Sequence, residues 1–208
     1  IVKPDLAVIT NISYAHAKNF KNLNQIADAK SEIIENINKG GSIILNQDDS
    51  FYKKQRKLAI KNKLKIKSFS LEKKSANVYI SKISRKKSKY KVMINVNKKN
   101  TFFYVRSIFE NELKNILAAL TLISTFMDVN NLDKNIFYKF KTPNGRGDIS
   151  KIKIKNKIIN FIDESYNANP LSVSSAIKNY DLIKSGNSHK NLILGDMLEL
   201  GKHTKKLH

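Results

Sequence analysis

Apolar runs and amphipathic segments alternate over residues 1–70, a pattern that predicts strands and helices in turn. Short apolar runs predict buried strands at 6–10, 42–45 and 66–69. Between these runs, apolar side chains recur at helical spacing and predict helices over 24–38 and 49–61. Gly40 and Gly41 end the first helix. Alternating strands and helices are typical of a parallel sheet in an α/β protein.

The pattern changes at residue 77, where apolar and polar positions begin to alternate one by one. Lys-rich turns separate three such segments, which predicts an antiparallel meander with strands over 77–83, 90–96 and 101–108. Leu113, Leu117 and Leu120 then share one face of a helix predicted over 110–127, and a shorter helix is predicted over 132–140.

Turn-forming residues from Thr142 to Asp148 predict a domain boundary. We therefore expect two domains, 1–147 and 148–208. In the second, an apolar run, a helical pattern and another apolar run predict a βαβ unit with elements at 158–162, 171–184 and 191–194. This unit would begin a second α/β domain.

Two polar strings, 163–170 and 195–201, each follow an apolar run that is predicted to be a strand. Ligands bind at such strand tips in open α/β sheets, so we expect the two strings to line one pocket. The polar side chains in them are Asp163, Glu164, Asn167, Asn169, Asp196 and Glu199. The alternative for the first string is an Asx turn before a helix that starts at Pro170.

The composition, with 41% hydrophobic residues, is that of a globular protein. No apolar run reaches the roughly 18 residues that a membrane helix needs, and Ile1 leads into a strand-like run without a signal-peptide pattern. Cys is absent, which excludes disulfides and thiolate metal sites. We expect a cytoplasmic protein that is a monomer.

The net charge of +22 raises the alternative of a basic nucleic-acid-binding module. All but four of the 39 basic residues are Lys, whereas Arg is the residue that reads guanine with two hydrogen bonds. The lysines are scattered over nearly every segment and form no stripe. Together with abundant Asn and Ile they fit the codon usage of an AT-rich genome. We therefore expect no nucleic-acid partner.

Two residues near the first strand are candidates for metal chemistry. His16 lies in the polar loop after that strand, where a His can bind a metal or a phosphate, or simply be hydrogen-bonded. Lys30 lies beside Ala27 and Ala29 on the following helix. Burial would lower the pKa of its amine, and a neutral amine can react with carbon dioxide to give a carbamate that binds Mg²⁺. The alternative is an ordinary surface Lys.

Three further residues are candidates for nucleotide contacts. Arg146 lies between two glycines, so it either swings in to neutralise phosphate charge or remains an exposed turn residue. Asn46 and Asp48 follow a strand, where they either bind a base or ribose or cap the next helix. The chain has no Gly-x-x-x-x-Gly-Lys-Ser/Thr phosphate loop.

Ordered motifs along nearly the whole chain resemble the Mur ligases of bacterial cell-wall synthesis. They are Ile9-Thr-Asn-Ile12 with His16, Ala29-Lys30-Ser-Glu-Ile33, Leu45-Asn46-Gln-Asp-Asp49, Asn115 with Ala118-Ala119, Gly145-Arg146, Ser165-Tyr-Asn-Ala-Asn-Pro170, Gly195-Asp-Met-Leu-Glu-Leu-Gly201 and His208. The resemblance implies a three-domain enzyme. This chain would hold the later part of the P-loop-type central ATPase domain, with an antiparallel β insertion, and the start of a Rossmann-like C-terminal domain.

The resemblance also implies an ATP- and Mg²⁺-dependent ligase that activates a peptide carboxylate as an acyl phosphate, which an amine then attacks. The strings 165–170 and 195–201 imply D-alanyl-D-alanine as the amine and UDP-N-acetylmuramoyl-tripeptide as the acceptor. A relative that adds a single amino acid is the alternative. By itself the chain is expected to be inactive, because the phosphate loop would lie upstream.

The resemblance implies roles for individual residues. His16 and carbamylated Lys30 would hold Mg²⁺, the nucleotide would be contacted by Asn46, Asn115, Arg146 and Glu164, and the dipeptide side of the cleft would be shaped by Asn167, Asn169 and Asp196. The chain departs from the family at Glu164, usually Asp, and at Phe109 and Asn111, usually Gly and His. These departures put the contact of Glu164 and the role of the segment before Asn115 in question.

Overall fold

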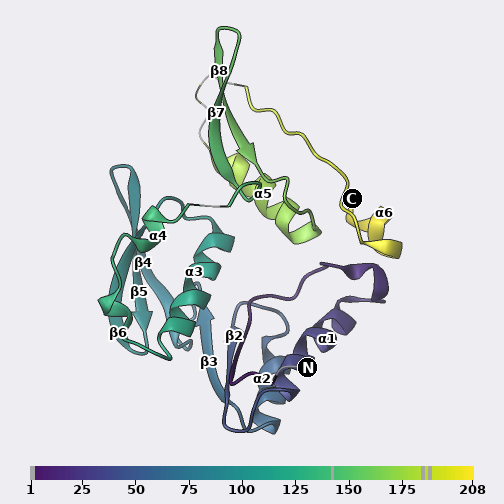
Figure 1. Ribbon diagram of the computed structural model, residues 1–208, viewed down its shortest axis with the longest axis vertical. Helices are drawn as coiled ribbons and strands as arrows, with labels where there is room; N and C mark the ends of the chain where they lie inside the picture. Colours follow the sequence, from purple (N-terminus) through teal and green to yellow (C-terminus); the bar gives the residue numbers. More distant parts are fainter. Residues whose placement is uncertain (1–2, 142, 184–185, 187–188) are drawn as a thin grey trace. The chain divides into compact units, whose positions relative to one another are not determined.

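The computed structural model describes residues 3–141, 143–183, 186 and 189–208, and the chain forms two compact units (Figure 1). Unit 1 holds the described residues up to Ile12 together with Leu23–Lys139. Unit 2 holds Ser13–Asn22 and the described residues of Phe140–His208. The connection after the first strand is therefore grouped with the C-terminal part of the chain.

A six-stranded mixed sheet forms the centre of unit 1, with the strands in the order of the chain. The first four strands are parallel, and they are β1 (Leu6–Ile9), β2 (Ser42–Asn46), β3 (Lys65–Ser70) and β4 (Val78–Lys86). The antiparallel strands that follow are β5 (Lys89–Val96) and β6 (Lys99–Val105). The predicted parallel part and the predicted meander are thus both confirmed, and the β3–β4 pairing joins them in one sheet.

Helices connect the strands and supply the core of unit 1. The helices are α1 (Leu23–Glu35), α2 (Tyr52–Lys61), α3 (Glu110–Ile123) and α4 (Ile136–Lys139). Leu117 and Leu120 of α3 are fully buried in one cluster with Ile44, Phe69 and Phe103. Because side chains alternate along a strand, Ile43 and Leu45 point to the opposite face from Ile44. Both faces of β2 are therefore covered, since Ile43 and Leu45 are also fully buried.

Most of the predicted elements in unit 1 are confirmed, but several helices are shorter than predicted. The helix predicted to reach residue 38 ends at Glu35, and the one predicted to reach 127 ends at Ile123. The second helix begins at Tyr52 rather than 49, because the Asp49 carboxylate accepts a hydrogen bond from the Phe51 amide in a turn.

Unit 2 contains an antiparallel hairpin followed by a helix. Strands β7 (Asp148–Ile154) and β8 (Lys157–Asp163) pair with each other, and α5 (Pro170–Leu182) follows. Strand β7 was not predicted from the sequence, because it directly adjoins the turn formers of the predicted domain boundary. Two predictions reach beyond the described residues, since Thr142 and residue 184 lie outside them.

The prediction of a βαβ unit in 148–208 was wrong. Residues 191–194 form no strand, and Figure 1 draws them as a trace without an arrow. A strand is defined by its hydrogen-bonded partner, and no segment in the described part of the chain pairs with this one. Ile193 is accordingly 92% exposed. An apolar run does not indicate which segment would pair with it, so the sequence could not show that a partner strand is lacking among the described residues.

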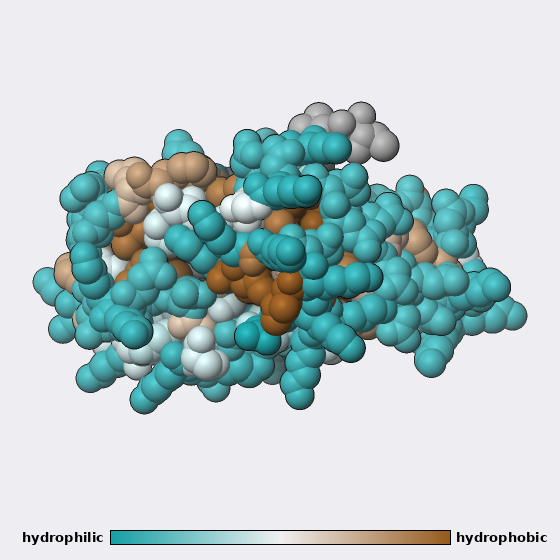
Figure 2. All heavy atoms as spheres, turned by 90° about the horizontal axis from the view of Figure 1, so that it is seen from below, coloured by the Kyte–Doolittle hydropathy of each residue, from teal (hydrophilic) through white to brown (hydrophobic). Residues whose placement is uncertain are grey.

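The surface is dominated by hydrophilic side chains. Figure 2 shows them spread across one face, with apolar patches between them rather than a single polar stripe. Among the residues that the structure describes, no helix is both long enough and apolar enough to cross a membrane.

Candidate functional site

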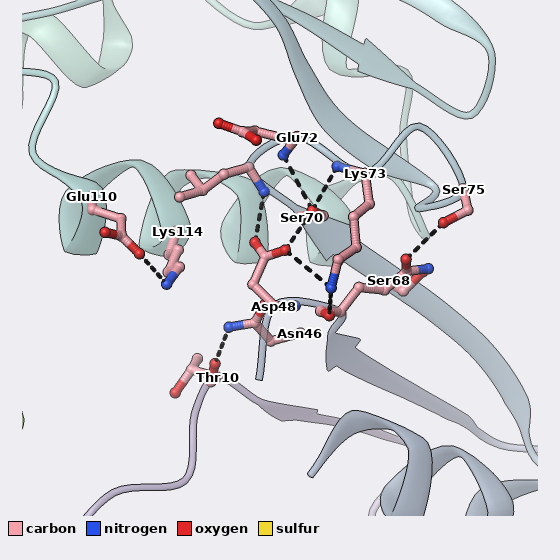
Figure 3. A network of polar contacts seen from close by, with 12 residues as sticks. Thr10, Asn46, Asp48, Ser68, Ser70, Glu72, Lys73, Ser75, Glu110 and Lys114 are labelled. Carbon is pink, nitrogen blue, oxygen red and sulfur yellow. Dashed lines mark hydrogen bonds and ion pairs between the residues drawn. The ribbon is translucent and has the colours of Figure 1, made fainter. Parts of the chain in front are cut away.

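The buried amide of Asn46 links the ends of β1 and β2. Its Nδ2 donates to the Thr10 carbonyl at 2.9 Å, and its Oδ1 accepts from the Asp48 amide at 2.9 Å (Figure 3). The residue is 3% exposed. Since α2 begins only at Tyr52, Asn46 does not cap that helix. It fixes the two strand ends at which a ligand of an α/β sheet would bind.

Asp48 makes the corresponding link between β2 and β3. Its Oδ1 accepts from the Ser70 hydroxyl at 2.6 Å, and its Oδ2 accepts from the Leu71 amide at 2.7 Å. Lys73 lies beside the carboxylate, with Nζ 3.8 Å from Oδ1 (Figure 3). The carboxylate is therefore used to hold the strand ends, which is a structural role.

Asp49 received no separate role from the sequence, yet it organises the start of the loop that carries His16. Its Oδ2 accepts from the Ile12 amide at 2.7 Å, and its Oδ1 accepts from the Phe51 amide at 2.8 Å. The signal that could have found it is an Asp at the start of a helical pattern, where an Asx turn is common.

The amine of Lys30 is partly desolvated. Its Nζ donates to the Asn11 carbonyl at 3.2 Å. Desolvation lowers the pKa of Lys30, and the charge of Asp49 partly opposes that shift. The residue as a whole is exposed, so the shift is that of a partly desolvated amine and not of a lysine in the core. At a given pH, a lower pKa leaves more of the amine neutral and able to react with carbon dioxide.

His16 lies in unit 2, in the loop 13–22, and adopts a left-handed backbone conformation with φ of 54°. Its Nδ1 contacts the Oε2 of Glu199, and its side chain is 73% exposed. Lys30 belongs to unit 1, so the structure gives the surroundings of these two residues separately. Within the described residues there is no group of three or more His, Asp and Glu side chains suited to a metal ion.

The segment around Arg146 is tied to the first polar string by backbone hydrogen bonds. The Gly147 amide donates to the Asp163 carbonyl at 2.7 Å, and the Tyr166 amide donates to the Gly145 carbonyl at 3.0 Å. Both glycines have positive φ, and a Cβ on Gly147 would lie 3.1 Å from the Glu164 carboxylate. The two motifs, which are separate in the sequence, thus lie side by side in the structure.

Arg146 itself is exposed, and its guanidinium carbon lies 4.0 Å from the centre of the Tyr166 ring. Stacking on an aromatic ring restrains the side chain while leaving its N–H groups available. A role for Tyr166 was not predicted from the sequence, because the position of an aromatic residue within a motif does not indicate which side chain its ring contacts.

Asn169 caps helix α5, as the alternative interpretation of its string predicts. Its Oδ1 accepts from the Leu171 and Ser172 amides at 3.1 and 3.0 Å, and its own amide donates to the Ser172 hydroxyl at 3.0 Å. Asn167 is exposed. Asp163 accepts a hydrogen bond from Ser165, which lowers the pKa of the carboxyl.

Replacing Asn169 with Ala is expected to weaken α5 by about 1 kcal/mol, because two helix amides lose their acceptor. Hydrogen exchange of the α5 amides in the full-length protein measures this change. Asn169→Asp, which keeps the acceptor, is the matched control and should retain protection. Equal protection in Asn169→Ala and the unchanged protein would show that the cap contributes nothing.

The remaining candidates are exposed. Asp196 lies in the string 195–201, which follows no strand, so the expectation of two strand tips side by side is corrected. Asn115 lies on the solvent side of α3. Phe109 stands before α3 in an extended conformation and makes no side-chain cap.

Comparison with known proteins gives one family. Residues 1–123 match the Mur ligase middle domain. The UDP-N-acetylmuramoyl-tripeptide–D-alanyl-D-alanine ligase of Buchnera aphidicola subsp. Baizongia pistaciae is 30% identical over all of this chain and 43% of its own length.

Two solved structures share the fold. MurF from Acinetobacter baumannii aligns with a TM-score of 0.81 and 26% identity, over 99% of this chain and 43% of that one. MurF ligase from Thermotoga maritima in complex with ADP aligns with a TM-score of 0.79 and 22% identity, over 99% and 45%. This chain therefore spans less than half the length of the proteins that it matches.

Proposed function

Because this chain belongs to the Mur ligase family, we propose that it is part of an ATP-dependent ligase that adds D-alanyl-D-alanine to UDP-N-acetylmuramoyl-tripeptide. The observation that carries the proposal is the alignment of the whole chain with a relative of that name. The strings 165–170 and 195–201 support this member over one that adds a single amino acid.

We assign residues 1–147 to the later part of the central ATP-binding domain and 148–208 to the start of the C-terminal domain. The match of residues 1–123 to the middle domain supports the first assignment. Unit 2 begins at Phe140, eight residues before the start of the proposed C-terminal domain, and it also holds Ser13–Asn22. The phosphate loop would then belong to a part of the enzyme that precedes this chain.

The chemistry of the two residues suits Mg²⁺ if Lys30 is carbamylated, and the family resemblance assigns both of them to one ion. A carbamate supplies the hard oxygen ligands that Mg²⁺ prefers, and the lowered pKa of Lys30 favours its formation. His16 would add an imidazole nitrogen. The bound ion would neutralise charge on the γ-phosphate and on the acyl phosphate. Asp49 accepts a hydrogen bond from the amide of Ile12 and so holds the start of the His16 loop. Its charge also opposes a larger decrease in the pKa of Lys30.

On the nucleotide side, Arg146 and Glu164 act from one site. The ADP complex of the Thermotoga maritima neighbour supports a nucleotide as ligand. The guanidinium of Arg146, restrained on Tyr166, would neutralise phosphate charge, and the Glu164 carboxylate would accept from a ribose hydroxyl. Asn46 contributes by fixing the strand ends, and Asn115 would contact the nucleotide from the exposed side of α3.

On the dipeptide side, the exposed Asn167 and Asp196 are the side chains free to meet an amine or a carboxylate. Asn169 uses its oxygen in the helix cap, so its own contribution would come through Nδ2. In the proposed ligase reaction these side chains form no covalent bond with the substrates. Holding the amine within reach of the acyl phosphate supplies most of the acceleration.

Phosphate release by the full-length protein tests the proposal. With ATP, Mg²⁺ and UDP-N-acetylmuramoyl-tripeptide present, release is expected to depend on added D-alanyl-D-alanine. Release that depends on a free amino acid would keep the family and change the member. The absence of release with either amine would contradict the proposed activity.

A further inference from the structure

The loop 13–22 is held against the C-terminal end of the chain. The short helix η1 (Ala17–Asn19) packs on η3 (Gly201–His203). The His203 Nε2 forms a hydrogen bond of 3.0 Å with the Phe20 carbonyl, and the rings of His203 and Tyr14 are 5.3 Å apart. Ala17 is fully buried, which shows that this part of the loop is packed against its surroundings.

The end of the chain is shaped for this close approach. Gly201 has φ of +54°, and a Cβ there would lie 3.0 Å from the Cα of Lys18 and 3.1 Å from its carbonyl oxygen. Glu199, two residues earlier, also has a positive φ of 61°, as does His16 at 54°. A left-handed conformation is costly for a residue with a side chain, so it persists only where the surroundings determine it.

Those two strained residues are the ones whose side chains meet. The His16 Nδ1 contacts the Glu199 Oε2, across 183 positions of the sequence. An ionised carboxylate can only accept hydrogen bonds, so the proton of a neutral imidazole must then reside on Nδ1. The lone pair of such an imidazole is on Nε2, which is then the ring nitrogen able to bind a metal ion.

We propose that Glu199 is a positioning residue that fixes the tautomer and the orientation of His16 for a divalent cation. A carboxylate that accepts the second ring N–H of a metal-binding His both orients the ring and raises its basicity. The inference rests on the proposed function, which assigns His16 to the metal. It adds a partner from the Gly-Asp-Met-Leu-Glu-Leu-Gly string, so that metal binding in the loop depends on the far end of the chain.

The test combines ¹⁵N NMR of histidine-labelled full-length protein with titration of Mn²⁺ alone, followed by electron paramagnetic resonance. At alkaline pH, where imidazole is neutral, His16 is expected to carry its proton on Nδ1. Glu199→Ala should lose this preference and weaken Mn²⁺ binding about 10–100-fold. Glu199→Gln, which retains an oxygen acceptor, should keep the tautomer and most of the affinity, and Glu72→Ala, which removes an exposed carboxylate elsewhere, should change neither.

A proton on Nε2 in the unchanged protein would overturn the proposal, as would unaltered Mn²⁺ affinity in Glu199→Ala. If Glu199→Gln loses as much affinity as Glu199→Ala, the pair acts as a charge contact and not through the tautomer, which also overturns it. Unaltered Mn²⁺ affinity in His16→Ala would remove the metal role of His16 and the proposal with it. The assay of phosphate release is separate, so its failure alongside the expected NMR and Mn²⁺ results would count against the ligase activity alone.

Discussion

Replacing Lys30 with Ala in the full-length protein is expected to lower turnover by about 10³-fold, a loss of the size seen when one electrostatic stabiliser of the developing charge is removed. The physical reason is the loss of the carbamate, and with it the oxygen ligands of Mg²⁺. The lowered pKa of Lys30 gives the sign of the pH effect, because a larger neutral fraction of the amine at a given pH favours carbamate formation. Phosphate release measures the rate, and a ¹³C carbamate signal after incubation with labelled bicarbonate measures the modification.

Two controls separate the carbamate from the positive charge. Lys30→Arg keeps a cation but cannot be carbamylated, so it should be as slow as Lys30→Ala. Short carboxylic acids should restore part of the activity of Lys30→Ala by supplying the missing oxygens, but should not restore that of Lys30→Arg, whose side chain fills the space. Lys57→Ala removes an exposed Lys from α2 and should be without effect. Activity in Lys30→Arg close to that of the unchanged protein would rule out the carbamate.

Much of unit 1 could be predicted because its elements are specified locally. The run that forms β2 is apolar on both faces, and the helical spacing of α3 is unambiguous. What the pattern did not contain is the parallel pairing of β3 with β4, which unites the two halves of the sheet. Pairing depends on contacts between segments, and a periodic pattern within one segment carries no information about its partner.

The same distinction explains the errors in unit 2. Residues 191–194 have the composition of a strand, but no partner occurs among the described residues. Conversely, β7 was not predicted although it has a partner in β8, since it directly adjoins a cluster of turn formers. Strand propensity mainly describes how well a side chain fits a half-buried pleated surface, so it is weak where that surface is not evident from sequence.

In the candidate site, some residue roles could be predicted from the sequence motif and others could not. Asn46, Asp48 and Asn169 are polar residues at the ends of elements, and all three use their side chains to hold backbone groups there. A polar residue at such a point satisfies backbone amides and carbonyls first. Asp49 and Tyr166, by contrast, gain their significance from neighbours that are distant in sequence, Ile12 and Arg146.

Replacing Arg146 with Ala is expected to lower kcat/KM for ATP by about 10²-fold, the loss typical for one donor that stabilises developing charge. The side chain projects from a segment in which both flanking glycines have positive φ, and it stacks on Tyr166 at 4.0 Å. Steady-state kinetics of the full-length protein, together with calorimetric titration of ADP, measure the effect.

Three variants distinguish the sources of this effect. Arg146→Lys retains the charge but not the planar fork that binds two oxygens at once, so its loss should be intermediate. Tyr166→Phe preserves the ring on which the guanidinium rests and should have little effect, whereas Tyr166→Leu should approach the loss seen in Arg146→Lys. Arg85→Ala, which removes an exposed Arg from β4, serves as the matched control. Kinetics of Arg146→Ala equal to those of Arg85→Ala would leave Arg146 as an exposed turn residue, since a guanidinium that meets the phosphates cannot be removed without raising the barrier or weakening the nucleotide.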